Sequence, residues 1–260
     1  MSYYDRGMAC LREGRFQEAR PLFEAATRLT PDSADSWKAL GLTLLRLNDY
    51  GAAAEPLRHA CELGPAGEDS CYLEGRVLFV LSRYDESIAP LEKALRNSGQ
   101  EDRAKIERAL ALACDKLGNS TEAERWFIAA IDHYRDAKSE DPRLDYGAFL
   151  VRQGRAGEAI KPLALALGAN PNSFAGNVEN GRALLDMDRP ADALPFLERA
   201  AAINASSSNA QMLLGKTLLR MGRTEEGERI LREGRKRWDA ANGDARKRWD
   251  AANQGSSSVK

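Results

Sequence analysis

The chain has 260 residues, of which 43% are hydrophobic and 30% are charged, and its formal net charge is -1. This apolar content excludes a disordered chain, and the near-zero net charge excludes a strongly basic nucleic-acid binder. No stretch approaches the roughly 20 apolar residues of a membrane helix, and the first residues lack the apolar segment of a signal peptide. We therefore expect a cytoplasmic protein without membrane insertion. Abundant Ala and sparse β-branched residues predict an all-helical fold.

Several series of residues recur along the chain in one register. Small residues recur every 34 to 36 positions at Gly7, Gly41, Gly75, Ala111, Gly147, Gly181 and Gly215. Large apolar residues follow at Phe23, Leu57, Leu91, Phe127, Leu163, Leu197 and Leu231. Turn-forming residues lie between them at Gly14, Asn48, Ser82, Gly118, Gly154, Asp188 and Gly222. The shared register predicts seven copies of one structural unit.

Each unit is predicted to contain two antiparallel helices. In the second unit, apolar spacing predicts a helix over 35–46, a turn at Asn48-Asp49, and a second helix over 50–63 that stops at Gly64-Pro65. Small residues let the two helices approach closely, and because one unit cannot bury both apolar faces, neighbouring units must stack. The predicted units are 1–33, 34–67, 68–103, 104–139, 140–173, 174–207 and 208–241.

The second unit also carries a recognisable motif. It reads Trp37, Leu40, Gly41 and Leu44, followed by Ala53, Leu57, Ala60 and Pro65. This pattern resembles the tetratricopeptide repeat family. The resemblance covers residues 1–241 and implies a single right-handed α-solenoid of seven antiparallel helix pairs.

The residues that could carry catalysis are few. His59 and His133 fall in second helices of different units, where we expect them to be structural or solvated. Phosphate-binding, dinucleotide-binding, zinc-protease and nucleophile-elbow motifs are absent, so we expect no enzyme, no cofactor and no metal. The cysteines are interpreted as buried small hydrophobes in a reducing compartment, with a Cys61–Cys71 disulfide as the alternative. They are Cys10, Cys61, Cys71 and Cys114.

A binding surface is the more plausible source of function. The family resemblance implies that the first helices line the concave face of the solenoid. The residues projected onto this face are Tyr4, Met8, Lys38, Leu42, Tyr72, Arg76, Phe79, Arg108, Arg182 and Lys216. Apolar side chains with interspersed cations suit a peptide that offers apolar anchors and carboxylates. The alternative is that some of these side chains only pack between neighbouring repeats.

The C-terminal segment repeats itself. RKRWDAAN occupies 235–242 and again 246–253, and the offset places Trp238 and Trp249 on one helical face. Asn242-Gly243 predicts a helix stop, so we expect 242–260 to be a basic tail with a short helix over 244–252 and then a disordered linker. The tail is interpreted as a cap, as an introduced duplication, or as a segment that inserts into a neighbouring molecule and causes self-association.

These observations predict a non-catalytic protein–protein interaction scaffold that binds a protein or peptide along its concave face, without nucleic acid. One alternative is a regulatory or substrate-recruiting portion of a larger enzyme or of a secretion or assembly machine. Another is a solenoid that binds RNA or DNA. Arg far outnumbers Lys, which is typical of a GC-rich bacterial genome.

Overall fold

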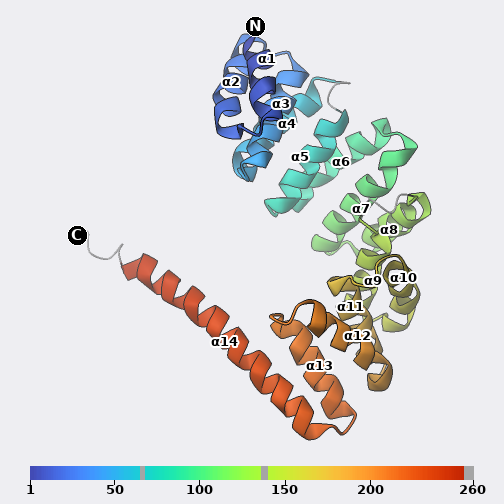
Figure 1. Cartoon of the computed structure of the whole chain (residues 1–260). Coiled ribbons are helices and arrows are strands. Elements are labelled where there is room, and N and C mark those ends of the chain that lie inside the picture. Colours follow the sequence, from blue (N-terminus) through green and yellow to red (C-terminus); the bar gives the residue numbers. More distant parts are fainter. Residues whose placement is uncertain (65–67, 136–139, 255–260) are drawn as a thin grey trace. The chain divides into compact units, whose positions relative to one another are not determined.

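The computed structural model describes residues 1–64, 68–135 and 140–254 (Figure 1). The all-α prediction is confirmed over these residues, which form helices joined by short connections. The chain divides into two compact units, Met1–Pro142 and Arg143–Lys260.

The helices follow one another as pairs. Those of the first unit are α1 (Tyr3–Arg12), α2 (Phe16–Leu29), α3 (Ala34–Arg46), α4 (Tyr50–Glu62), α5 (Glu68–Val80), α6 (Tyr84–Asn97), α7 (Gln100–Lys116) and α8 (Ser120–His133). The second unit comprises α9 (Pro142–Arg152, which begins at the boundary), α10 (Ala156–Ala169), α11 (Phe174–Asp186), α12 (Pro190–Ile203), α13 (Ser208–Arg220) and α14 (Thr224–Gln254).

The turn inside each pair has the same backbone conformation throughout. The predicted turn residues all have positive φ, from 54° at Asp188 to 77° at Gly118 and Gly222. The next amide then bonds back to a carbonyl five residues earlier, as in Asp49 N to Leu44 O at 2.9 Å. This closure satisfies carbonyls left open at the end of the first helix. The recurring turn residues of the sequence therefore mark positions where the backbone needs a positive φ.

The two helices of a pair touch where the small residue meets the large one. A Cβ built on Gly41 would lie 2.6 Å from Leu57 Cδ2, and one built on Gly147 would lie 2.4 Å from Leu163 Cγ. Both leucines are fully buried. The glycine thus removes the side chain that would hold the helices apart, and the leucine fills the space beside it.

The connections between repeats use a second recurring device. The side chains of Trp37, Asn177 and Gln211, which occupy one register position, each donate to the carbonyl six residues earlier, at 2.8 to 2.9 Å. Just before this position, Ser33 and Ser173 accept from backbone amides as helix N-caps. Each connection is therefore tied to the first turn of the helix that follows it.

The cysteines differ in part from the expectation. Cys61 near the end of α4 and Cys71 near the start of α5 form a disulfide, with Cα atoms 4.7 Å apart. Cys10 and Cys114 are buried free thiols, as expected. The prediction of four free cysteines is therefore wrong for Cys61 and Cys71, because the α4–α5 connection brings their helix ends within disulfide range.

Two predicted boundaries also differ. The helix α14 continues to Gln254 through Asn242-Gly243, so the stop at this pair and the separate helix over 244–252 are wrong. A single glycine costs a helix only about 1 kcal/mol, and the Ala240-Ala241 and Ala245-Arg246 pairs on either side of 242–244 are good helix formers. The predicted repeat boundary at 104 also differs, because the first helix of the fourth pair, α7, begins four residues earlier at Gln100. The side chains of Trp238 and Trp249 and the expected linker over 255–260 lie outside the described residues.

Candidate partner-binding face

The predicted binding residues of the first unit occupy one side of its first helices. Tyr4, Lys38, Tyr72 and Arg108 share one register position in α1, α3, α5 and α7, and all four side chains are half-buried. One turn further on, Met8 and Leu42 are half-buried and Arg76 is exposed at a second shared position. The helix α1 contacts α3, and α5 contacts α7, while Lys38 of α3 reaches Asp69 of α5. The two positions therefore form two rows of side chains along one face.

Tyr72 lies at the centre of a cationic cluster. The guanidinium of Arg76 lies 5.6 Å from the centre of the Tyr72 ring, and Lys105 Nζ of the next repeat lies 5.1 Å from it. Lys105 also pairs with Asp102 at 2.5 Å, whereas Arg76 is exposed. The ring thus holds two cations close together, each of which gains from the negative face of the π system.

Like Tyr72, the first-row residues Lys38 and Arg108 each meet a residue of the following repeat. Lys38 Nζ lies 3.3 Å from Asp69 Oδ2, and Arg108 forms an ion pair with Glu140. The acidic side chains are 64% and 74% exposed, so these pairs are screened by water and contribute little to stability. A carboxylate from a bound partner would therefore replace either acid at small cost.

Tyr4 and Phe79 are engaged mainly with their own repeats. The Tyr4 ring meets Phe23 edge-on at 5.9 Å, and Phe79 meets Tyr84 edge-on at 5.1 Å. Burial raises the pKa of Tyr4, and the charge of Asp35 raises it further. Met8 packs against the core cluster around Phe23. These three side chains are therefore engaged in packing, which was the alternative to partner binding.

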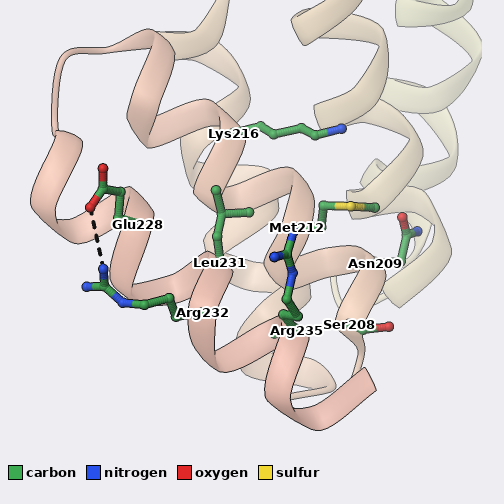
Figure 2. A pocket seen from close by; sticks show the side chains of 9 residues that line it. Ser208, Asn209, Met212, Lys216, Glu228, Leu231, Arg232 and Arg235 are labelled. Carbon is green, nitrogen blue, oxygen red and sulfur yellow. Dashed lines mark hydrogen bonds and ion pairs between the residues drawn. The ribbon is translucent and has the colours of Figure 1, made fainter. Parts of the chain in front are cut away.

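The two remaining predicted residues lie in the second unit. Arg182 in α11 pairs with Glu179 at 3.1 Å, and burial raises the pKa of that glutamate. Lys216 in α13 is exposed and lines a groove of about 800 Å³ between α13 and α14 (Figure 2). The structure thus places eight of the ten predicted residues in the first unit and two in the second.

Asp69, Lys105 and Glu140 were missed among the site residues. Asp69 and Lys105 share a register position with Asp35, so Lys38 and Tyr72 each face this position in the next repeat, whereas Arg108 pairs with Glu140, one residue before it. The pairing is chemically matched, with Lys38 opposite an acid and Tyr72 opposite a cation. A comparison of register positions across consecutive repeats would have found this pairing from the sequence.

His133 and Glu107 form the polar contact that most resembles a catalytic pair. Glu107 in α7 is 1% exposed and accepts from His133 Nδ1 at 2.8 Å, while Arg103 lies 3.6 Å away. A buried carboxylate with a hydrogen-bond partner and a nearby guanidinium is a satisfied structural group. His59 is stacked on Trp37 with ring centres 4.5 Å apart. Over the described ranges, no group of three or more His, Cys, Asp or Glu is placed to hold a metal ion.

Among the described helices, none has the length and apolar character needed to cross a membrane. The chain matches family models described as tetratricopeptide repeat over residues 4–68 and 72–142 and, with a second model, over 184–237. Together these matches cover well over half of the sequence.

Similar proteins include Tetratricopeptide repeat protein 16 of Homo sapiens, which is 35% identical over 79 residues, 30% of this chain and 9% of that protein. The curated relatives are much longer, and the matched segments span only 6% and 9% of two of them. A tetratricopeptide repeat protein from Parabacteroides merdae has a similar structure, with a TM-score of 0.67, 15% identity, and coverage of 90% of this chain and 91% of that one. YrrB gives a TM-score of 0.56 at 22% identity, covering 72% of this chain and 95% of that one. These likenesses confirm the solenoid fold.

Proposed function

The chain belongs to the tetratricopeptide repeat family, and we propose that it is a scaffold that binds a segment of a partner protein along its first helices. The family fold is a protein-interaction fold. The observation that carries the proposal is the double row of half-buried and exposed side chains on α1, α3, α5 and α7. Such a row offers apolar contact and charge at regular intervals along an extended chain.

The Tyr72 cluster indicates the chemistry of the partner. Arg76 and Lys105 flank the ring of Tyr72. In the two neighbouring repeats, the register position of Tyr72 is held by the cations Lys38 and Arg108. A peptide with carboxylates spaced between apolar anchors would meet both features. YrrB, which has the same fold, is a tetratricopeptide repeat protein with an unusual peptide-binding site. That precedent supports peptide binding for this chain, while the near-neutral charge argues against nucleic acid.

A displayed peptide library selected on the protein, followed by calorimetry, tests the proposal. We expect acidic peptides with apolar anchors that bind with micromolar affinity. Arg76→Glu reverses an exposed charge on α5 and should weaken binding at least tenfold. Arg96→Glu makes the same change on the exposed surface of α6 in the same repeat and should leave affinity within twofold. Equal affinity of wild type and Arg76→Glu would contradict the proposed face.

A second candidate is that the solenoid is the recruiting part of a larger enzyme or of a secretion or assembly machine. The small share of the curated relatives covered by the match favours it, because their repeats belong to much longer chains. The size of the complete gene decides this candidate, since a gene that encodes only these 260 residues would reject it.

Self-association through the Trp238/Trp249 tail stays a prediction. Light scattering on the chain with and without residues 243–260 tests it. The number of chains per particle is compared. The same number with and without the segment would contradict self-association through the tail, and a fall from dimer to monomer would support it.

A further inference from the structure

The groove between α13 and α14 lies at the C-terminal edge of the helix stack. Met212 and Lys216 of α13 line one side, and Leu231 of α14 lies at its base beside α13 (Figure 2). The rest of the lining is charged or polar, apart from one glycine, and consists of Ser208, Asn209, Glu228, Arg232, Gly234 and Arg235. The groove thus has two apolar side chains, Met212 and Leu231, with charged and polar groups around them.

The same place in other repeats is filled by a helix. The second helices α2, α4, α6, α10 and α12 each contact the first helix of the next repeat, namely α3, α5, α7, α11 and α13. The residues equivalent to Leu231 are accordingly at most 1% exposed: Phe23, Leu57, Leu91, Phe127, Leu163 and Leu197. Leu231 is only half-buried, because no helix follows α14 in the part of the chain that the structure describes. The groove therefore lies where the first helix of a further repeat would pack.

The charge of the groove is positive and unbalanced. Arg232 pairs with Glu228 in its own helix at 3.5 Å, whereas Lys216 and Arg235 form no ion pair within the described residues. Arg235 stands where other repeats have buried residues such as Cys61, Leu95 and Leu167. A polar cap that only shielded the edge from water would need no particular sign of charge. Two free cations beside Met212 and Leu231 instead favour an anionic occupant.

We propose that this edge groove binds an acidic amphipathic helix of a partner protein, which stacks on α13 and α14 as a further first helix would. Apolar side chains of that helix cover Leu231 and Met212, and its carboxylates pair with Lys216 and Arg235. A second copy of the basic tail is a poor occupant, because 235–260 carries seven basic and three acidic residues. The site is separate from the face on α1, α3, α5 and α7 and does not depend on it.

Fluorescence polarisation with a synthetic helical peptide tests the proposal on the full chain. The labelled peptide carries Leu at every third and fourth position and Glu elsewhere, and a matched peptide carries Lys in place of Glu. We expect saturable binding of the Glu peptide that weakens as salt rises, and at least tenfold weaker binding of the Lys peptide. No saturable binding of the Glu peptide, or equal binding of both peptides, would overturn the proposal.

Matched charge reversals locate the site. Lys216→Glu with Arg235→Glu should weaken the Glu peptide at least tenfold, while Arg229→Glu with Lys236→Glu makes the same change on exposed positions of α14 outside the groove and should stay within twofold. Circular dichroism of each variant is the control for folding. Both double variants are also measured in the Arg76→Glu background, which weakens any binding of the acidic peptide to the first-helix face, so that the remaining loss reports on the edge groove alone. An equal loss of peptide affinity in both double variants would overturn the proposal. So would a dimer of the wild-type chain that only the Lys216→Glu/Arg235→Glu variant abolishes.

Discussion

Gly41 in α3 lies where this helix crosses α4, and a Cβ added there would lie 2.6 Å from Leu57 Cδ2. Because Leu57 is fully buried, it cannot turn away. We therefore expect Gly41→Ala to lower the free energy of unfolding by about 1–3 kcal/mol despite the better helix propensity of Ala. Gly51→Ala is the matched control, since nothing lies within 4 Å of its added Cβ, and it should be neutral or stabilising. Urea unfolding of both variants gives the comparison, and equal effects would contradict the packing account.

Glu74 in α5 carries the most perturbed carboxyl group of the described first unit. It is 8% exposed, and burial, aided by the charge of Glu62, raises its pKa to about 7 against the lowering effects of Arg58 and Lys93. The unfolded chain loses this proton at about pH 4.5, whereas the folded chain keeps it to about pH 7. The folded state binds more protons in that window, so this group makes stability fall as pH rises through it.

Glu74→Gln places a neutral side chain of the same shape at this position. We expect the variant to be more stable than wild type by about 1–3 kcal/mol above pH 7, with the difference vanishing near pH 4.5. Unfolding in urea at several pH values between these limits measures the effect. A constant difference between variant and wild type across the range would show that Glu74 is not the titrating group.

At the scale of elements, the Cys61–Cys71 disulfide joins α4 to α5 across ten residues of sequence. Closing a loop of that length stabilises a fold by about 3 kcal/mol through the unfolded state. We expect a reductant to lower the thermal midpoint of the wild type by several degrees, and the Cys61→Ser/Cys71→Ser double variant to be insensitive to reductant. A wild-type midpoint that does not respond to reductant would contradict this, and free-thiol titration provides the control for complete reduction.

The elements show how far local sequence signals reach. The turn series at Gly14, Asn48 and their equivalents predicted the positive-φ positions, because a closing turn after a helix needs the same conformation in every repeat. The Asn242-Gly243 pair carries a similar signal, yet α14 continues through it. A stop signal ends a helix only where the following residues have another place to pack, and one sequence segment does not reveal this. The Cys61–Cys71 disulfide was predicted only as an alternative for a different reason, since sequence spacing alone does not orient two thiols.

At the scale of the whole molecule, the repeat register predicted which residues lie on the first-helix face but not what they contact there. Lys38, Tyr72 and Arg108 reach the next repeat, whereas the rings of Tyr4 and Phe79 pack within their own repeats and Met8 packs against the core. This division depends on packing distances between neighbouring helices. The edge groove was not predicted from the sequence. It exists because no described helix packs on α13 and α14 at this place, and a repeat pattern alone does not show which surface stays open.

Hydrogen–deuterium exchange of the full chain, with and without a peptide selected on it, tests the scaffold account most directly. We predict that the bound peptide slows amide exchange most in α3, α5 and α7, which carry Lys38, the Tyr72 cluster and Arg108. The second helices α4 and α6 should change less. Protection confined to α4 and α6, or the same protection in the Arg76→Glu variant, would contradict the account.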